Sequence, residues 1–152
     1  VKMRVLSVCT GNTCRSPMLT AALQIESNKL NLSAVFEGAG VGQSAATNLS
    51  AAEHAQTCFP GLLEEHKSTH ISKRVLKDYD IILCLTEGHK NGVMEEIQKQ
   101  QGAVSAEDEA KVRVFPGGMP DPVGGPLEEY QSCAAQCREW AQLILKETMS
   151  KS

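Results

Sequence analysis

The fold is decided by residues 2–17, which read KMRVLSVCTGNTCRSP. Residues 2–8 are mostly apolar and predict a buried strand. Pro17 is typical of the first turn of a helix, which we expect over residues 17–29. The short loop between them is small and polar, so the free N–H groups at the helix start can point into it and bind an anion. This stretch therefore predicts a phosphate-binding loop between a strand and a helix.

Two residues of this loop carry chemistry, Cys9 and Arg15. Five residues separate them, so a curled loop brings the thiol and the guanidinium to one bound oxyanion. A helix N-terminus and a neighbouring arginine both favour the thiolate, which is the nucleophilic form of cysteine. An arginine can hold two phosphate oxygens at once. We therefore expect Cys9 to be a nucleophile and Arg15 to be a phosphate clamp.

The remaining loop residues fit the same purpose. Gly11 lets the backbone approach a phosphate closely, and Asn12 tolerates the positive φ that an anion-binding nest requires. Ser16 is placed to form a hydrogen bond with the Cys9 sulfur. The backbone amides expected to cradle the anion are those of Thr10, Gly11, Asn12, Thr13 and Cys14.

The composition limits the class of protein. The chain has 152 residues, of which 41% are hydrophobic, so residues 1–152 are expected to form a single domain. Its net charge of −3 gives no reason to expect nucleic acid as a partner. No stretch approaches the roughly 20 apolar residues of a membrane span, and the N-terminal apolar segment is too short for a signal peptide. Six cysteines are too few for a disulfide-stapled secreted domain, so we expect a cytoplasmic location.

Alternating strands and helices follow the loop. We expect strands at 34–39, 80–86 and 112–115, and helices at 50–63, 87–101 and 126–148. Ser50 is the expected N-cap of the second helix, and Ser72 is expected to cap a short turn. Segments 102–109 and 117–125 are expected to be loops. This order predicts an α/β fold, a three-layer sandwich around a parallel sheet, with ligands bound at the carboxyl ends of the strands.

A family resemblance rests on several of these segments. Residues 9–18, CTGNTCRSPM, resemble the signature of the low-molecular-weight protein tyrosine phosphatase family. The similarity continues through EGAGV at 37–41, DIILCLT at 80–86 with His89 and Lys90, and PDPVGGP at 120–126. It implies a central four-stranded parallel sheet with flavodoxin-like winding. It also implies a phosphorylated protein as substrate, a phosphocysteine intermediate, inorganic phosphate as product, and no metal or cofactor.

Such a phosphatase must protonate its leaving group, and Asp121 is the expected acid and later base. It lies between Pro120 and Pro122 in a glycine-rich loop after the last expected strand, at the same sheet end as Cys9. The alternative is an ordinary turn aspartate, since Asp-Pro is a common turn dipeptide.

In the family, a strained loop asparagine is held by a hydrogen-bonded set of side chains. Asn12, Ser16 and His66 match three of its members, and the spacing from Asp80 favours His66 over His70. Gly38 stands where a serine is usual, so we expect this part of the network to be missing or replaced by water. The alternative for His66 is a surface histidine without a role.

Specificity is expected to depend on Thr13 and Val123. Thr13 matches the protein arginine phosphatase branch, where tyrosine-directed members more often carry isoleucine. Val123 replaces the aromatic residue usual after Asp-Pro and removes one wall of the pocket. Phosphoarginine is therefore the expected substrate, with phosphotyrosine phosphatase and arsenate reductase as the alternatives. The arsenate reductase relay is incomplete here, because Cys84 lies within a strand and the next cysteine is Cys133.

Two alternative hypotheses lie outside this enzyme class: a phosphocysteine carrier and a non-catalytic phosphate-binding module. Arg15 and Asp121 argue against the carrier, and the retention of both Cys9 and Asp121 argues against the module.

The remaining cysteines are expected to play minor roles. Cys14 could form a reversible disulfide with Cys9, or it could simply pack the loop. Cys133 and Cys137 lie four residues apart on the last helix, but no other metal ligand is near them in sequence, so we expect core thiols. The other residues expected in the core are Cys58, Cys84, Trp140, Leu143 and Ile144.

Overall fold

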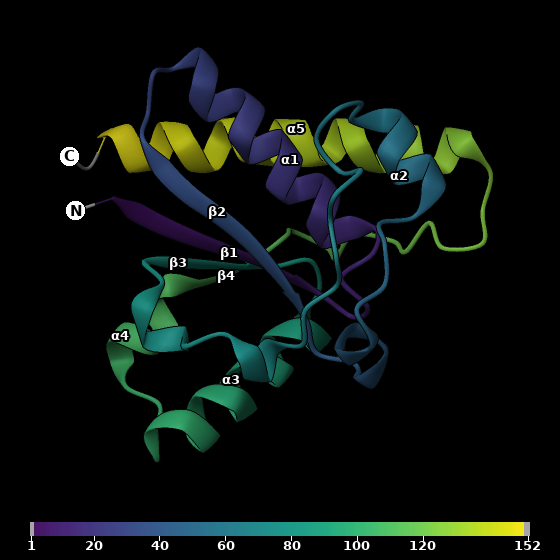
Figure 1. Cartoon of the computed structure of the whole chain (residues 1–152). Coiled ribbons are helices and arrows are strands. Elements are labelled where there is room, and N and C mark those ends of the chain that lie inside the picture. The colour runs from purple at the N-terminus through teal and green to yellow at the C-terminus, as the bar shows by residue number, and fades with distance from the viewer. Residues whose placement is uncertain (1, 151–152) are drawn as a thin grey trace.

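The computed structural model describes residues 2–150, which form three layers (Figure 1). The central layer is a parallel sheet with the strand order β2-β1-β3-β4. Its strands are β1 (Met3–Cys9), β2 (Ala34–Gly40), β3 (Ile81–Cys84) and β4 (Val112–Val114). Since β1 lies between β2 and β3, the winding is flavodoxin-like, as predicted.

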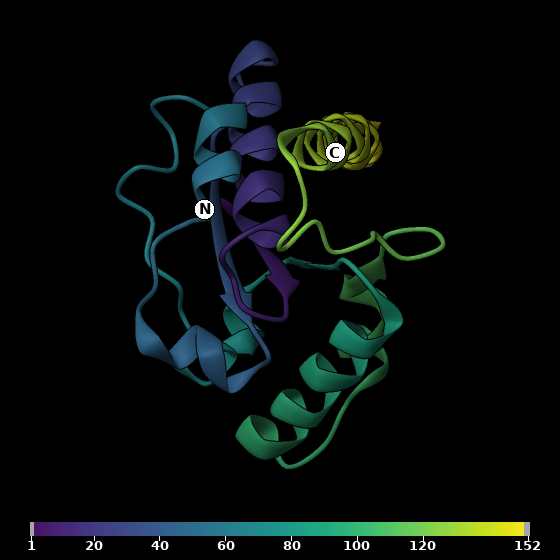
Figure 2. The same ribbon diagram turned by 90° about the vertical axis from the view of Figure 1, so that its right-hand side faces the viewer.

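Helices cover both faces of the sheet. Figure 2 shows α1 (Arg15–Lys29) and α5 (Leu127–Ser150) together on one side and α3 (Glu87–Gln101) on the other. α4 (Ala106–Lys111) lies on the α3 side in Figure 1, and α2 (Glu53–Cys58) packs against α5. Within residues 2–150 there are also three short 3-10 helices, at Gln43–Thr47, Ile71–Lys73 and Leu76–Asp78. None of the helices described is long and apolar enough to cross a membrane.

Strand β1 supplies both halves of the core because its side chains alternate between the two faces. Val5 packs into the cluster beneath α1 and α5, whereas Leu6 and Val8 pack into the cluster beneath α3. Cys9 is the last residue of β1, so the loop that follows emerges at the carboxyl edge of the sheet. This edge holds the candidate site.

The prediction of a loop over 102–109 is wrong, because α4 begins within it. Ser105 and Asp108 form a capping box: the Ser105 hydroxyl accepts from the Asp108 N–H, and the Asp108 carboxylate accepts from the Ser105 N–H. A serine followed three residues later by an acidic residue is a known helix-start signal. The polar composition of this segment concealed it.

The helix expected over 50–63 is much shorter than predicted. It spans only Glu53–Cys58, and its N-cap residue, Ala52, makes no side-chain capping bond. Ser50 is not an N-cap; its hydroxyl accepts a hydrogen bond from the Lys67 ammonium group at 3.1 Å. Gly61, with φ of +83°, lies in a turn that no helix can continue through.

Three smaller expectations also need correction. Ser72 does not cap its turn; instead the His70 side chain accepts the Ser72 N–H and serves as the N-cap. Leu143 is 50% exposed and does not belong to the inner face of α5, although Trp140 and Ile144 are buried there as predicted. Cys58 is only half-buried, at the rim of the core.

Candidate active site

The loop after β1 curls around the Cys9 thiol. The sulfur lies 2.9 Å from the Ser16 hydroxyl oxygen, and it accepts the Asn12 backbone N–H at 3.3 Å. Cys9 and Ser16 are both buried, at 3% and 0% exposed. The predicted hydrogen bond between Ser16 and Cys9 is therefore present. Ser16 lies in the first turn of α1.

Asn12 fixes the shape of this loop. It adopts a left-handed backbone with φ of +56° and is completely buried. Its side-chain amide donates to Ser16 Oγ at 2.7 Å, while its side-chain oxygen accepts the Thr69 N–H at 3.0 Å. Both ends of the side chain are thus held, which compensates for the unfavourable φ.

His66 holds the Asn12 backbone. Its Nε2 atom donates to the Asn12 carbonyl oxygen at 2.7 Å. Burial lowers the pKa of His66, which favours the neutral imidazole. His66 thus has the place predicted for it, whereas His70 caps a turn.

A side chain at Gly38 would require the Asn12 side chain to shift. A Cβ atom at Gly38 would lie 2.8 Å from the Asn12 side-chain nitrogen, which is closer than such atoms approach. The Gly38 carbonyl oxygen accepts two bonds from the Arg74 guanidinium, at 2.9 and 3.1 Å. Gly38 has no hydroxyl, so this member of the expected network is missing, and Asn12 is held by Ser16, Thr69 and His66.

Arg15 connects the loop to the segment that carries Asp121. It is 6% exposed and donates through Nη1 to the Met119 carbonyl oxygen at 2.9 Å. Its Nη2 atom lies 3.4 Å from Asp121 Oδ2, and Asp121 remains 43% exposed. The other carboxylate oxygen accepts the Val123 N–H at 3.1 Å. A buried cation and a solvent-accessible carboxylate therefore face each other across the loop.

Cys9, Arg15 and Asp121 line one small cavity. Its volume is about 200 Å³. The residues that line it are Cys9, Thr10, Gly11, Thr13, Cys14, Arg15, Ser44, Asp121 and Val123. The thiol, guanidinium and carboxylate identified in the sequence thus share one cavity with Thr13 and Val123. A tetrahedral anion bound there would meet a nucleophile, a cation and a proton carrier together.

Sequence reasoning missed two residues around this cavity, Ser44 and His89. Ser44 reaches the cavity from the Gln43–Thr47 turn. His89 is buried in α3, and its Nε2 atom lies 2.9 Å from Thr10 Oγ1. Burial, followed by the nearby Arg15 charge, lowers the pKa of His89 to about 4, so its ring is neutral at pH 7. Ser44 has no local sequence signal, and although His89 belongs to a segment of the family resemblance, no residue near it indicates its contact with Thr10.

The six cysteines are all free thiols. Cys14 Sγ lies 3.6 Å from the Tyr130 hydroxyl, and burial raises the pKa of the Cys14 thiol. A disulfide between Cys9 and Cys14 therefore stays a prediction. Cys84 is buried within β3, which raises the pKa of its thiol to about 12. Among residues 2–150, no group of three or more His, Cys, Asp or Glu side chains is placed to hold a metal ion.

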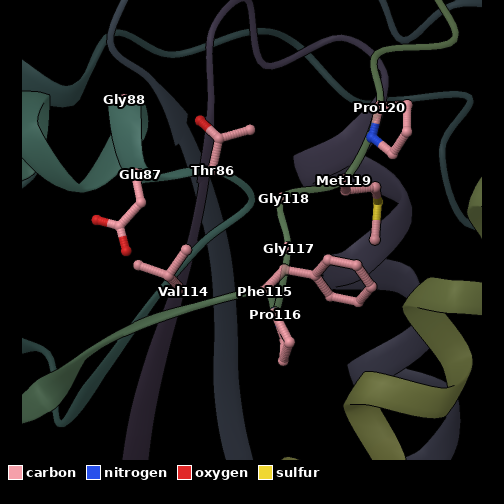
Figure 3. Close-up of a pocket in the computed structure, with 10 residues that line it drawn as sticks. All are labelled: Thr86, Glu87, Gly88, Val114, Phe115, Pro116, Gly117, Gly118, Met119 and Pro120. Atoms are coloured by element: carbon pink, nitrogen blue, oxygen red, sulfur yellow. The ribbon is translucent and has the colours of Figure 1, made fainter.

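A larger hollow of about 720 Å³ lies beside the cavity, between the start of α3 and the segment after β4 (Figure 3). Its lining includes Thr86, Glu87 and Phe115, but neither Cys9 nor Arg15 nor Asp121. Only Glu87 in it carries a charge, so this hollow does not hold the reactive groups.

The chain is similar to known proteins of one family. Residues 4–152 match the profile of a family described as low molecular weight phosphotyrosine protein phosphatase. A protein-arginine-phosphatase from Geobacillus stearothermophilus is 34% identical over 140 residues, covering 85% of this chain and 84% of its own length. The low molecular weight protein-tyrosine-phosphatase Wzb of Escherichia coli K12 is 31% identical over 150 residues, covering 92% and 94%. The structure of a low molecular weight protein tyrosine phosphatase from T. tengcongensis superposes with a TM-score of 0.80 at 29% identity, covering 95% and 99%.

Proposed function

The chain belongs to the low molecular weight phosphotyrosine protein phosphatase family and is a cysteine-based protein phosphatase, and we propose that its substrate is phosphoarginine in proteins. The proposal assigns Cys9 as the nucleophile, Arg15 as the phosphate clamp and Asp121 as the acid and base. Residues 1–152 act as one domain, in the cytoplasm, where reducing conditions keep the Cys9 thiol free.

The first step transfers the phosphoryl group to Cys9. The sulfur attacks phosphorus while the phosphorus–nitrogen bond to the guanidino group breaks. Arg15 and the loop amides bind the three equatorial oxygens, where charge is concentrated in the transition state. The protonated Asp121 gives its proton to the departing nitrogen, which leaves as the guanidinium of an ordinary arginine.

The second step releases phosphate. A water molecule attacks the phosphorus of phosphocysteine, the phosphorus–sulfur bond breaks, and Asp121 takes a proton from the water. Ser16, at 2.9 Å from the sulfur, stabilises the thiolate that leaves. The products are inorganic phosphate and the starting enzyme, so no cofactor takes part in this scheme.

The lining of the small cavity is the observation that carries the choice of phosphoarginine. Three hydroxyl-bearing residues, Thr10, Thr13 and Ser44, line it together with Asp121, and no aromatic residue does. A phosphotyrosine ring gains most of its binding from stacking and apolar contact. A cationic guanidino group instead gains from hydroxyl oxygens and a carboxylate. The exposed Val123 side chain leaves the entrance open to a long arginine side chain.

Phosphotyrosine is the second candidate substrate. It is favoured by the identity of 31% to the protein-tyrosine-phosphatase Wzb, and the same three catalytic groups would act on an aryl phosphate. Arsenate reduction is less well supported, because Cys84 is buried in the sheet and cannot easily accept an oxidising equivalent from Cys9.

The proposal is tested by kcat/KM for a phosphoarginine protein and a phosphotyrosine peptide, with the Cys9→Ser variant as the blank. We expect a preference for phosphoarginine of more than about tenfold, a difference of about 1.4 kcal/mol in transition-state binding. A preference for phosphotyrosine would replace this proposal with the second candidate. Release that persists in Cys9→Ser would remove Cys9 as the nucleophile.

A further inference from the structure

Three sulfur atoms meet in the core behind Arg15. Cys133 Sγ lies 3.2 Å from Met119 Sδ, and Cys137 Sγ lies 3.9 Å from the same atom. Both cysteines come from α5, whereas Met119 comes from the segment that leads to Asp121. All three residues are buried, at 3%, 0% and 1% exposed. In Figure 3 the Met119 sulfur points away from Thr86 and Glu87, on the side of α5.

This group, Met119, Cys133 and Cys137, is hereafter the sulfur cluster. The two cysteines alone, one helical turn apart, provide only two ligands. Met119 supplies a third, from a segment that the cysteine spacing does not reveal. Thiolate and thioether sulfur are soft ligands, and together they select Cu(I) over harder ions.

We propose that the sulfur cluster is a site for Cu(I), bound by the two cysteine thiolates and the methionine thioether. On binding, each thiol loses its proton, so two protons are released and the bound group carries a net charge of −1.

The distances from the Met119 sulfur to the two cysteine sulfurs can be compared with those around one bound ion. With metal–sulfur bonds of about 2.3 Å, three sulfurs around one ion in a plane lie about 4 Å apart. The separation between Cys137 and Met119 already has this value, at 3.9 Å. The separation between Cys133 and Met119, at 3.2 Å, must open slightly. Methionine has three rotatable side-chain bonds and adapts to such a shift.

The sulfur cluster is linked directly to the phosphate clamp. Arg15 Nη1 donates to the Met119 carbonyl oxygen at 2.9 Å, and Cys137 Sγ lies 4.0 Å from the Arg15 carbonyl oxygen. Met119 also precedes Asp121 by two residues. Cu(I) would therefore place a negative group beside the guanidinium and move the acid segment. On the proposed function given above, Cu(I) inhibits phosphate release.

Binding is tested first, without activity. The Cys9→Ser/Cys14→Ser variant removes the thiols of the active-site loop, and it is titrated anaerobically with Cu(I) buffered by a chelator. We expect one bound ion per chain, with the near-ultraviolet absorption of a Cu(I)–thiolate group. Adding Cys133→Ala and Cys137→Ala should weaken binding by about 100-fold or more, because loss of an outer-shell partner alone costs 10–100-fold. Met119→Leu keeps the side-chain volume and should also weaken Cu(I) binding. It replaces the double alanine variant in this test if that variant does not fold.

Cys58→Ala is the matched control, since it removes a half-buried thiol outside the sulfur cluster. It should keep the affinity for Cu(I). The proposal is overturned if Cu(I) binding survives the loss of Cys133 and Cys137, or if no ion binds once Cys9 and Cys14 are replaced.

Inhibition is then measured with Cys9 intact. Buffered Cu(I) should inhibit the wild-type chain at a lower concentration than the Cys133→Ala/Cys137→Ala variant, in which only the loop thiols remain to bind it; inhibition of both at the same Cu(I) concentration would overturn the link to Arg15. If neither chain releases phosphate from either substrate, the proposed function fails while the binding result still decides the copper site.

Discussion

Ser16 Oγ lies 2.9 Å from Cys9 Sγ, and the same oxygen accepts the side-chain N–H of Asn12 at 2.7 Å. Because Asn12 donates to this oxygen, the Ser16 proton is free to point at the sulfur. The thiolate form of Cys9 therefore has a hydroxyl donor held in place by the loop asparagine. A chain of three neighbouring contacts, from His66 through Asn12 to Ser16, thus ends at the nucleophile.

Replacing Ser16 with alanine should slow the reaction. A hydrogen bond to a charged group contributes about 1.5–3 kcal/mol, so we expect kcat/KM to fall roughly 10- to 100-fold. The control is Ser27→Ala, which removes another buried serine of α1 whose hydroxyl bonds only within its own helix. An unchanged kcat/KM in Ser16→Ala would show that this hydroxyl does not assist the thiolate.

Adding a side chain at Gly38 should disturb the loop. A Cβ atom there would press on the Asn12 amide, which is bonded at both ends and cannot easily move. We expect Gly38→Ala to cost about 1–3 kcal/mol in the free energy of unfolding and to lower kcat. Urea unfolding measures the first effect. Gly88→Ala, where a new Cβ meets nothing closer than 3.6 Å, is the control that should not be destabilised.

The buried His89 makes stability depend on pH. Its pKa of about 4 lies below the ordinary value of 6.5, so the folded state resists protonation that the unfolded state accepts. Stability from this residue is complete above pH 6.5, falls as the pH drops from 6.5 to 4, and levels off below 4. The total loss is about 3 kcal/mol. Urea unfolding of wild type and His89→Gln across this range should show a shallower fall in the variant; parallel curves would contradict the assignment.

The placement of the reactive loop could be predicted because its signals are local. Cys9, Asn12 and Arg15 lie within seven residues between a strand and a helix, and the structure brings them together in one loop, while their catalytic roles stay predictions. The same holds for β1 and α1. In contrast, Ser44 lines the cavity and His89 contacts Thr10 from separate segments, and no neighbouring residue indicates these positions.

The wrong predictions have a common cause: one local sequence signal was outweighed by another in the same segment. The stretch around Ser50 has a helical apolar period, but Pro60 and Gly61 end the helix early and Ser50 pairs with Lys67 instead. Ser105 and Asp108 form a capping box inside a segment whose polarity suggested only a loop. Leu143 follows Trp140 by three residues, yet the helix turns it to solvent, since α5 buries only one stripe.

Replacing Asp121 with asparagine should slow the protein substrate more than an aryl phosphate whose leaving group needs no proton. Asp121→Asn cannot protonate a leaving group, and a positioned acid contributes a factor of about 10²–10⁴. We expect turnover of the protein substrate to fall by this factor, while an aryl phosphate with an acidic phenol as leaving group loses less in phosphocysteine formation. Rapid-quench measurement of phosphocysteine distinguishes the two. An equal loss for both substrates would show that Asp121 acts in binding or in hydrolysis of the intermediate, rather than as the acid.

The central claim is that Cys9 takes its phosphoryl group from phosphoarginine. The most direct measurement mixes the enzyme with one protein that carries both phosphoarginine and phosphotyrosine, quenches the reaction at times shorter than one turnover, and locates phosphate by mass spectrometry. We predict that phosphoarginine is lost first and that phosphate appears on Cys9. Earlier loss of phosphotyrosine, or loss of phosphoarginine without any phosphate on Cys9, would contradict the claim.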